Sequence, residues 1–317
     1  MKNRVKSHAL SDRLGYAYSG LSIAMVSAVC LLIVLNVFYV GIDVISWDFL
    51  TQEPSASAIH AHEGGILTPM VGTMLLTVIG IAISLPLSIC TGVYLCFYAR
   101  KGLFHRLVTT AIDILSGVPT IVIALFALAV FTLPQLGFLS SRIETSQGLG
   151  NSFGRSFLVA GITMAIMVLP FITKSIVQAL KAVPVSYIEG AYSLGASKWH
   201  TITRIVLYVA RQGIITGTIL GMGRIVGDTA IVWLALGGTL RMTGVQPWWE
   251  PQNWLSTLQN TGSTLTSYIF YASPAGEGNN YEVAFGASFV LIVIILILNI
   301  VTDLVGRIGT RGMTDKR

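Results

Sequence analysis

Residues 283–302 read VAFGASFVLIVIILILNIVT, twenty consecutive positions without a charged side chain. A helix of about 20 apolar residues is long enough to cross the hydrocarbon core of a bilayer. Four further uncharged runs reach at least 18 residues, and one more apolar segment is interrupted by three charges. They are, in chain order, 14–42, 64–99, 114–141, 156–173 and the interrupted 207–238. The sequence therefore predicts an all-α polytopic membrane protein with six transmembrane helices.

The composition supports lipid as the solvent. Of the 317 residues 53% are hydrophobic and only 11% are charged, whereas soluble domains carry about 25% charged residues. The first run follows basic residues, as a signal peptide does, but its length and the lack of a small-residue cleavage site favour a retained span. Cys30, Cys90 and Cys96 show neither metal-ligand spacing nor a disulfide framework, so we expect small buried core residues.

The basic residues predict the topology. With six spans and both termini cytoplasmic, sixteen of the 20 Lys and Arg residues fall on the inner side, as the positive-inside rule requires. This placement explains the net charge of +6 without nucleic acid as a partner. We expect an N-terminal part over 1–68, a transmembrane domain over 69–306 with an inner loop over 178–206, and a cytoplasmic tail over 307–317.

The inner loop predicts two short helices joined by a turn. From 181 to 202 it reads KAVPVSYIEGAYSLGASKWHTI. Pro184 suits the start of a helix, Gly195 a left-handed helix end, and Ser197 the cap of the next helix. One helical face is expected to carry residues spaced by four and three positions: Tyr187, Ala191 and Leu194. Such an amphipathic hairpin can lie on lipid or dock into another protein.

The same loop resembles the EAA loop of bacterial binding-protein-dependent ABC permeases. The usual Glu-Ala-Ala-x-x-x-Gly is matched by Glu189, Ala191 and Gly195, with Gly190 at the middle Ala and Ala196 following; Leu207-Tyr208 stands where Leu-Pro closes the motif. The resemblance implies a type I importer (MetI-like) permease fold and a coupling helix that sits in a cleft of an ATPase subunit. The sequence has no phosphate-binding Gly-x-x-x-x-Gly-Lys-Ser/Thr loop, so ATP and Mg would be used by that partner and this chain would bind no cofactor. The alternative is an ordinary surface hairpin.

The interrupted fifth span carries the most informative charges. Gly213, Gly217 and Gly221 recur every four residues, a pattern of close helix packing. Arg224 and Asp228 follow at the same spacing, which predicts one helical face. A charge at the bilayer centre costs about 2.5–3.5 kcal/mol on insertion scales. The two residues therefore form either a self-neutralising intrahelical pair or part of a permeation path, where an arginine fork suits an oxyanion.

A second resemblance favours the path. Residues 224–230, RIVGDTA, resemble the Arg-Ala-x-Gly-Glu-Thr-Ala stretch of phosphate-importer permeases of the PstA and PstC types, and 116–122, SGVPTIV, resembles their Gly-x-Pro-Ser-Ile-Val. The likeness covers roughly 70–305 and is closer to PstA in its long outer loop. It implies six substrate-path residues: Pro119, Thr120, Lys174, Arg224, Asp228 and Thr229. Asp228 replaces the usual Glu, and 174–177, KSIV, replaces Arg-Thr-Thr-Glu, keeping a cation but losing an acid.

These resemblances imply a non-enzymatic permease subunit that imports inorganic phosphate across the bacterial plasma membrane. The implied partners are an ATP-binding subunit dimer, a second PstC-like permease chain (or a second copy), an extracytoplasmic phosphate-binding protein and membrane lipid. Sulfate, molybdate, tungstate or phosphonate are alternative substrates. A passive anion channel would leave the EAA-like loop without a role, and a membrane-embedded enzyme lacks a legible catalytic cluster.

Weaker signals lie near the membrane surfaces. The His60-x-His62-Glu63 sequence has two metal-ligand types but no further cluster, so no metal site is predicted. Asp113 and Asp303 are expected at inner span ends, with a gating role open for Asp113. Three tryptophans are expected in the interfacial belt or against an outer partner: Trp248, Trp249 and Trp254. A turn is expected at 273–276.

Overall fold

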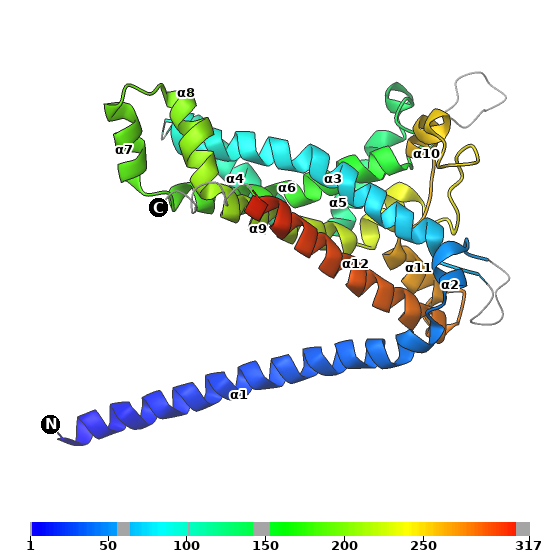
Figure 1. Ribbon diagram of the computed structural model, residues 1–317, viewed down its shortest axis with the longest axis horizontal. Helices are drawn as coiled ribbons and strands as arrows, with labels where there is room; N and C mark the ends of the chain where they lie inside the picture. Colours follow the sequence, from blue (N-terminus) through cyan, green and yellow to red (C-terminus); the bar gives the residue numbers. More distant parts are fainter. Residues whose placement is uncertain (1, 56–63, 101, 142–152, 309–317) are drawn as a thin grey trace.

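The computed structural model describes residues 2–55, 64–100, 102–141 and 153–308, and every element in them is helical (Figure 1). The α-helices are α1 Lys2–Gly41, α2 Trp47–Thr51, α3 Leu67–Val93, α4 Leu103–Gly117, α5 Thr120–Phe131, α6 Phe157–Lys181, α7 Val185–Ser193, α8 Lys198–His200, α9 Leu207–Val226, α10 Trp254–Gln259, α11 Leu265–Ala272 and α12 Tyr281–Ile308. Three π-helical segments are η2 Tyr94–Tyr98, η4 Thr201–Val206 and η5 Val232–Leu236, and three 3-10 turns are η1 Ile42–Val44, η3 Pro134–Leu136 and η6 Pro251–Asn253.

The predicted all-helical membrane fold is confirmed. Five of the described helices are long and apolar enough to cross a membrane, and α4 with α5 forms a sixth span if that bent pair is one. The bundle has two ends: α7 and α8 project at one, and α10 and α11 lie toward the other (Figure 1). We refer to these as the α7 end and the α10 end.

Helix α6 forms the centre of the bundle, with α3 and α9 packed against it. Two thirds of its most apolar stretch is buried inside this one chain. Ser156 caps its first turn by accepting a 3.1 Å hydrogen bond from the Val159 amide, which satisfies an otherwise unpaired helix-end donor. The helix continues to Lys181, well beyond the uncharged run that predicted it, because the lysines near its end point out of the apolar core.

The glycine spacing of α9 produces the predicted close packing. A Cβ added at Gly213 would lie 2.3 Å from the Ala179 Cβ, and one at Gly217 would lie 2.9 Å from the Ser175 Cβ. The Ser175 hydroxyl donates a 3.3 Å hydrogen bond to the Gly213 carbonyl across the same contact. Only glycine therefore lets α9 approach α6 this closely.

The third span is not the single helix predicted over 114–141. Val118 is extended (φ −72°, ψ 129°) immediately before Pro119, because a residue that precedes proline is disfavoured in the helical region. The chain consequently bends by 104° between α4 and α5. The 12 residues of α5 rise only about 18 Å, too little to cross a hydrocarbon core of about 30 Å alone.

The fifth span is also broken. Helix α9 ends at Val226, Gly227 to Thr229 are not helical, and one π-helical turn follows as η5. Gly237 ends that turn with φ +106°, a left-handed conformation that glycine adopts without a Cβ clash. The continuous span predicted to 238 is therefore wrong beyond Val226.

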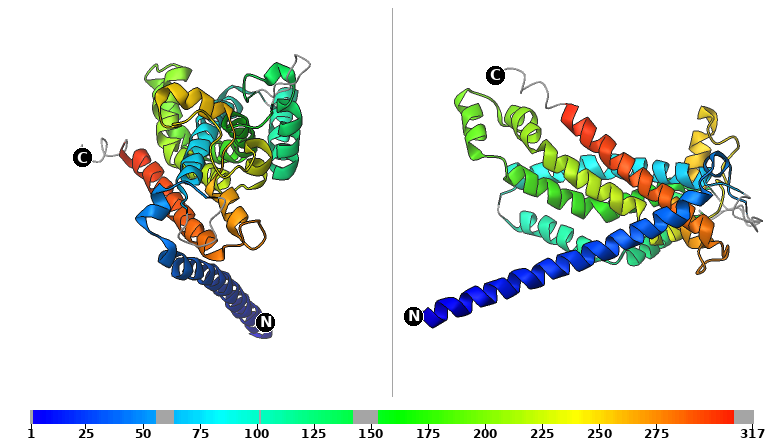
Figure 2. Two further views of the ribbon diagram at one scale, coloured as in Figure 1. Left: turned by 90° about the vertical axis from the view of Figure 1, so that its right-hand side faces the viewer. Right: turned by 60° about the horizontal axis from the view of Figure 1, so that its bottom comes forward.

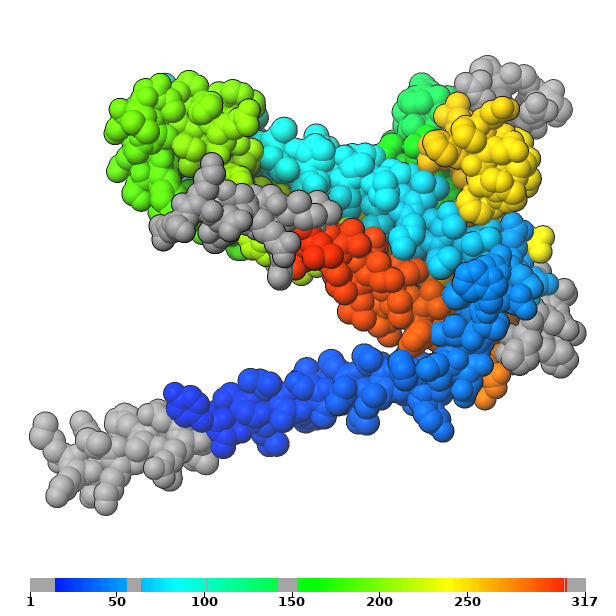
Figure 3. Space-filling model, in the orientation of Figure 1, coloured from blue at the N-terminus to red at the C-terminus, as the bar shows by residue number. Residues whose placement is uncertain are grey.

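Helix α1 stands apart from the bundle. It touches α12 near its C-terminal end, where Phe38 and Phe289 stack edge to face at 5.2 Å, and diverges from it toward the N-terminus (Figures 2 and 3). Residues 15–36 are exposed in the single chain. Cys30 and Cys90 are exposed as well and Cys96 is partly buried, so the expectation of buried core cysteines is wrong.

The α10 end is built from short helices and turns. The Gly276 amide donates a 2.9 Å hydrogen bond to the Ser273 carbonyl, which confirms the predicted turn. Trp248 and Trp249 stack edge to face at 5.4 Å, and the Trp254 indole donates to the Trp249 carbonyl at 3.2 Å. The three tryptophans thus form one cluster at this end of the molecule.

Candidate functional site

The helical hairpin at the α7 end follows from its local sequence. Pro184 precedes the first helical residue of α7, Gly195 adopts φ +79°, and the Ser197 side chain accepts a 3.3 Å hydrogen bond from the His200 amide. All three predicted helix-end signals are confirmed. Their combined effect is a sharply defined α7–turn–α8 unit that protrudes from the bundle (Figure 3).

The predicted amphipathic face of α7 is only partly covered within this chain. Ala191 is buried (5% exposed), but Tyr187 is 52% and Leu194 is 91% exposed. Glu189 and Gly190 are exposed, whereas Ala196 is half-buried. Of the five EAA-like residues, Ala191 is therefore the one that is fully buried within this chain. The hairpin instead presents an apolar surface made of Val185, Tyr187, Leu194 and Trp199.

A lysine ties this hairpin to the end of the second span. Lys198 Nζ donates a 2.5 Å hydrogen bond to the Phe97 carbonyl and lies 4.4 Å from the centroid of the Tyr98 ring. Both partners belong to η2. The hairpin is thus attached directly to α6 through 182–184, to α9 through η4, and to η2 through this contact.

Arg224 lies in the last turn of α9, at the break of the fifth span. Its guanidinium carbon is 3.9 Å from the centroid of the Phe171 ring, and its Nε is 3.0 Å from the Met167 Sδ. A cation at this position is favoured by the unpaired carbonyl groups of a helix C-terminus. No carboxylate in the described part of the chain lies within 4.0 Å of its nitrogens. The side chain is exposed in the single chain and retains free donors.

Asp228 lies in the break itself. Its Oδ1 accepts a 2.8 Å hydrogen bond from the Ile231 amide and so caps the helical turn that follows. The Thr120 side chain, at the start of α5, and the Arg224 guanidinium also interact favourably with the charged carboxylate. The self-neutralising pair within one helix is therefore wrong: Arg224 ends α9, Asp228 lies in the break beyond it, and the two form no ion pair within 4.0 Å.

The two broken spans meet at this point. Pro119 and Thr120 begin α5 after its break, and Asp228 and Thr229 lie in the break after α9. The resemblance implied that these four residues share a path with Arg224, whereas the two helix breaks that carry them were not predicted. The Thr229 side chain makes no contact with the others among the described hydrogen bonds, and its carbonyl accepts from the Trp233 amide at 3.0 Å.

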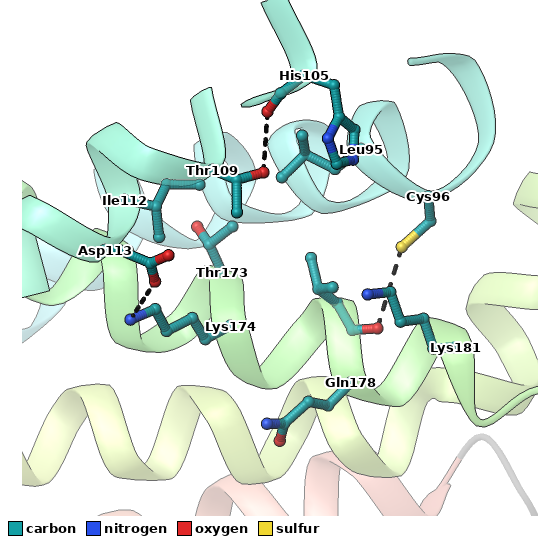
Figure 4. A pocket seen from close by; sticks show the side chains of 11 residues that line it. Leu95, Cys96, His105, Thr109, Ile112, Asp113, Thr173, Lys174, Gln178 and Lys181 are labelled. Carbon is teal, nitrogen blue, oxygen red and sulfur yellow. Dashed lines mark hydrogen bonds and ion pairs between the residues drawn. The ribbon is translucent and has the colours of Figure 1, made fainter. Parts of the chain in front are cut away.

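Lys174 lies apart from Arg224 and pairs with a different helix. Its Nζ is 2.8 Å from the Asp113 Oδ1 (Figure 4). The same Nζ donates a 2.8 Å hydrogen bond to the Ser116 hydroxyl. Asp113 thus supplies the acid that the local sequence 174–177 lacks. Sequence reasoning missed this pair, although Asp113 and Ser116 are three residues apart on a helix and so face the same way.

One face of α6 carries three side chains in a row: Phe171, Lys174 and Lys181. Phe171, which holds the Arg224 guanidinium, is three residues before Lys174, and Lys181 follows seven residues later. This spacing keeps the positions on one side of a helix, and it spans about 15 Å along its axis at 1.5 Å per residue. The row runs from the helix break toward the α7 end. Sequence reasoning also missed Phe171 and Met167, which lie about one and two helical turns before Lys174 and gave no other signal.

No cluster of three or more His, Cys, Asp or Glu side chains occurs among the residues that the structure describes. His60, His62 and Glu63 lie outside the described residues.

A bundle of apolar helices with two broken spans and a protruding hairpin is the structure of an integral membrane protein. Comparison with known proteins identifies its kind. The chain belongs to the family described as binding-protein-dependent transport system inner membrane components, whose sequence profile matches residues 84–315. It is therefore a multi-pass inner-membrane permease subunit of the ABC transporter class, and not itself an enzyme.

Individual relatives agree with this assignment. The chain is 27% identical over 310 residues to the probable ABC transporter permease protein YqgI of Bacillus subtilis (strain 168), covering 96% of this chain and 98% of that one. It is 30% identical over 239 residues to the phosphate transport system permease protein PstA of Mycobacterium leprae (strain TN), covering 75% and 71%. A probable phosphate transport system permease protein PstC of Methanocaldococcus jannaschii (strain ATCC 43067 / DSM 2661 / JAL-1 / JCM 10045 / NBRC 100440) is 32% identical over 278 residues, covering 82% and 80%. The resemblance to PstA-type permeases is thus confirmed.

The fold is also that of solved ABC transporters. A chain of a bacterial alginate ABC transporter, solved in complex with an alginate pentasaccharide-bound periplasmic protein, superposes with a TM-score of 0.60 at 17% identity, covering 93% of this chain and 97% of that one. The predicted type I importer fold is confirmed.

Proposed function

We propose that this permease subunit translocates inorganic phosphate, with Arg224 as the anion-binding group at the centre of the membrane. The proposal rests on one observation: the Arg224 guanidinium is exposed at a helix break and has no carboxylate within ion-pair distance in the described chain. A planar guanidinium presents a fork of donors that fits the oxygens of a tetrahedral oxyanion. Phe171 holds the group by its π face, which leaves these donors available.

Asp228, Thr120 and Lys174 have complementary roles in this proposal. The Asp228 carboxylate accepts from the Ile231 amide and interacts with Thr120, so in this proposal it joins the two helix breaks and leaves the Arg224 donors free for the anion. Pro119 and Thr229 set the backbone of these breaks. Lys174, one helical turn along α6 from Phe171, is the next cation toward the α7 end. The PstA and PstC names of several relatives support phosphate as the substrate; sulfate, molybdate and related oxyanions fit the same chemistry.

We further propose that the α7 end is cytoplasmic and that the hairpin docks on an ATPase subunit. A side chain such as Leu194, 91% exposed, is stabilised when a partner covers it. The topology with both termini cytoplasmic places the basic residues of this end inside, in accord with the positive-inside rule. Hydrolysis of ATP with Mg by an ATPase dimer then moves α6 and α9 through their connections to α7.

The remaining partners follow from the proposed importer. One six-span subunit forms half of a two-fold pore, so a second related permease chain, PstC-like or a second copy, completes it. An extracytoplasmic phosphate-binding protein delivers the anion at the α10 end. The family name, which specifies a binding-protein-dependent system, supports such a partner.

Radiolabelled uptake in cells that carry the full complex tests the substrate. We expect phosphate uptake to exceed that of sulfate and molybdate, and Arg224→Gln to abolish it at equal membrane levels of the protein. Arg241→Gln is the matched control, because Arg241 contacts Glu53 at 3.7 Å and the Pro54 carbonyl at the α10 end. Uptake at the wild-type rate by Arg224→Gln contradicts the proposed role.

Coupling is tested separately. Replacing Glu189 by Gln or Gly195 by Val is expected to lower ATP-dependent uptake while the complex still assembles in the membrane. Coupled uptake that persists unchanged in both variants contradicts the docking role of the hairpin.

A further inference from the structure

A cleft of about 270 Å³ lies between α4, α6 and η2, on the α7 side of the helix breaks (Figure 4). Lys174 and Lys181 line it from α6, Asp113 and His105 from α4, and Cys96 from η2. The volume equals that of roughly nine water molecules at about 30 Å³ each. It is therefore large enough for a small hydrated ion.

The lining has an excess of positive charge. Asp113 is the carboxylate in the cleft and is already paired with Lys174 at 2.8 Å. Lys181 makes no ion pair with any residue of the described chain. Because the two lysines are seven residues apart, they extend from one face of α6. The cleft thus holds one uncompensated ammonium group.

An independent observation points to a ligand. Thr173 is fully buried, with 0% exposure, and its hydroxyl has no hydrogen-bond partner. Thr173 lines the same cleft, and its hydroxyl lies between α6 and α4 (Figure 4). Buried hydroxyls without a partner are rare, since their desolvation is not compensated. A group with acceptor oxygens bound in the cleft satisfies the hydroxyl and the free ammonium together.

We propose that this cleft is a second oxyanion subsite, which binds a phosphate group through Lys174, Lys181 and the Thr173 hydroxyl. The choice of ligand rests on the proposed function. An anion that arrives from Arg224 replaces Asp113 as the counter-ion of Lys174, and so releases α4 from α6 next to the coupling hairpin. The same chemistry is present in a phospholipid headgroup, so the phosphate group has two sources that experiment must separate.

Cys96 provides a local probe, because it lines the cleft and is partly buried. The chain with Cys30→Ser and Cys90→Ser, assembled in its full complex, is placed in nanodiscs of neutral phosphatidylcholine. The rate of Cys96 alkylation is followed by mass spectrometry as inorganic phosphate, sulfate or chloride is added at constant ionic strength. A parallel series without added phosphate uses nanodiscs that contain phosphatidic acid.

We expect phosphate to slow the alkylation of Cys96 at least several-fold, whereas chloride does not. Lys181→Gln and Thr173→Val are each expected to raise the half-protecting phosphate concentration about tenfold, which corresponds to about 1.4 kcal/mol. Arg100→Gln removes a basic residue near Cys96 that does not line the cleft, and it is expected to retain the protection. The ratio of the alkylation rates with and without phosphate is taken within each variant, so a variant's own change in thiol reactivity cancels.

Each outcome has a distinct meaning. Protection by free phosphate in neutral lipid assigns the subsite to the transported anion, and protection by phosphatidic acid alone assigns it to a lipid headgroup. Absence of protection by either, or equal protection in Lys181→Gln and Arg100→Gln, overturns the subsite. If cells import phosphate but Cys96 is not protected, the subsite fails and the proposed function stands. If sulfate protects and phosphate does not, the subsite stands and phosphate is the wrong substrate.

Discussion

Replacing Gly213 by alanine tests whether the contact between α6 and α9 positions Lys174 on α6 relative to Arg224 on α9. The new Cβ would lie 2.3 Å from the Ala179 Cβ, against 3.4 Å for the start of ordinary contact, so the helices must separate by about 1.1 Å. A gap of 0.5–1 Å already removes about a quarter to a half of the dispersion energy of a contact. The methyl carbon of an alanine is fixed by the backbone, so neither Ala179 nor the new side chain can turn away and the strain cannot be relieved by a rotamer change.

The expected cost is that of an overpacked core, about 1–3 kcal/mol. Alanine favours a helix over glycine by about 1 kcal/mol, which offsets part of that cost. The net loss of stability is therefore about 0–2 kcal/mol, obtained from these two terms. Because α6 carries Lys174 and α9 carries Arg224, phosphate uptake is expected to fall as well.

The control lies on the same helix. Gly223 has no atom within 4 Å of its added Cβ, so Gly223→Ala gains helix propensity without a clash. The assay is unfolding of the purified chain in mixed micelles by titration with dodecyl sulfate, which yields the free energy of unfolding. Equal stability of Gly213→Ala and Gly223→Ala would refute the close approach of the two helices.

Three further predictions concern the hairpin and the ion pair. Leu194→Ser should change stability by less than about 0.5 kcal/mol, since the side chain is 91% exposed, and yet reduce co-purification with the ATPase subunit. Gly195→Ala should destabilise the hairpin by about 1–2 kcal/mol, because φ is +79° there, measured as faster proteolysis of the α7–α8 turn. Asp113→Asn and Lys174→Gln should show a coupling of about 0.2–1 kcal/mol in a double-mutant cycle of unfolding, a range that allows for the exposure of Asp113 (59%) and Lys174 (42%).

Matched variants make these predictions specific. Leu103→Ser, 83% exposed on α4, should leave ATPase co-purification unchanged, and an equal loss in both leucine variants contradicts a local docking surface. Gly190→Ala has open space around its Cβ and should not accelerate cleavage; equal cleavage of both glycine variants excludes backbone strain as the cause. Additive effects of Asp113→Asn and Lys174→Gln show that the pair contributes nothing.

Local rules explain why much of the fold could be predicted. An uncharged run of 18 or more residues needs lipid whatever its neighbours are, so the membrane class and most of the spans follow from the chain alone. The hairpin is equally local, because Pro184, Gly195 and Ser197 act through their own backbone geometry. The spacing of the glycines in α9 likewise indicated close packing without identifying α6 as the partner.

The site required the tertiary structure, since its contacts join residues far apart in the chain. A four-residue spacing placed Arg224 and Asp228 on one helix, but the break at Gly227 separates them, and Phe171 and Thr120 from other helices become their partners. The carboxylate that pairs with Lys174 comes from Asp113, 61 residues earlier in the chain. Sequence determined which segments are helical because helix formation and lipid solvation are local; only packing decided which charges meet, because electrostatic partners are selected by distance in space.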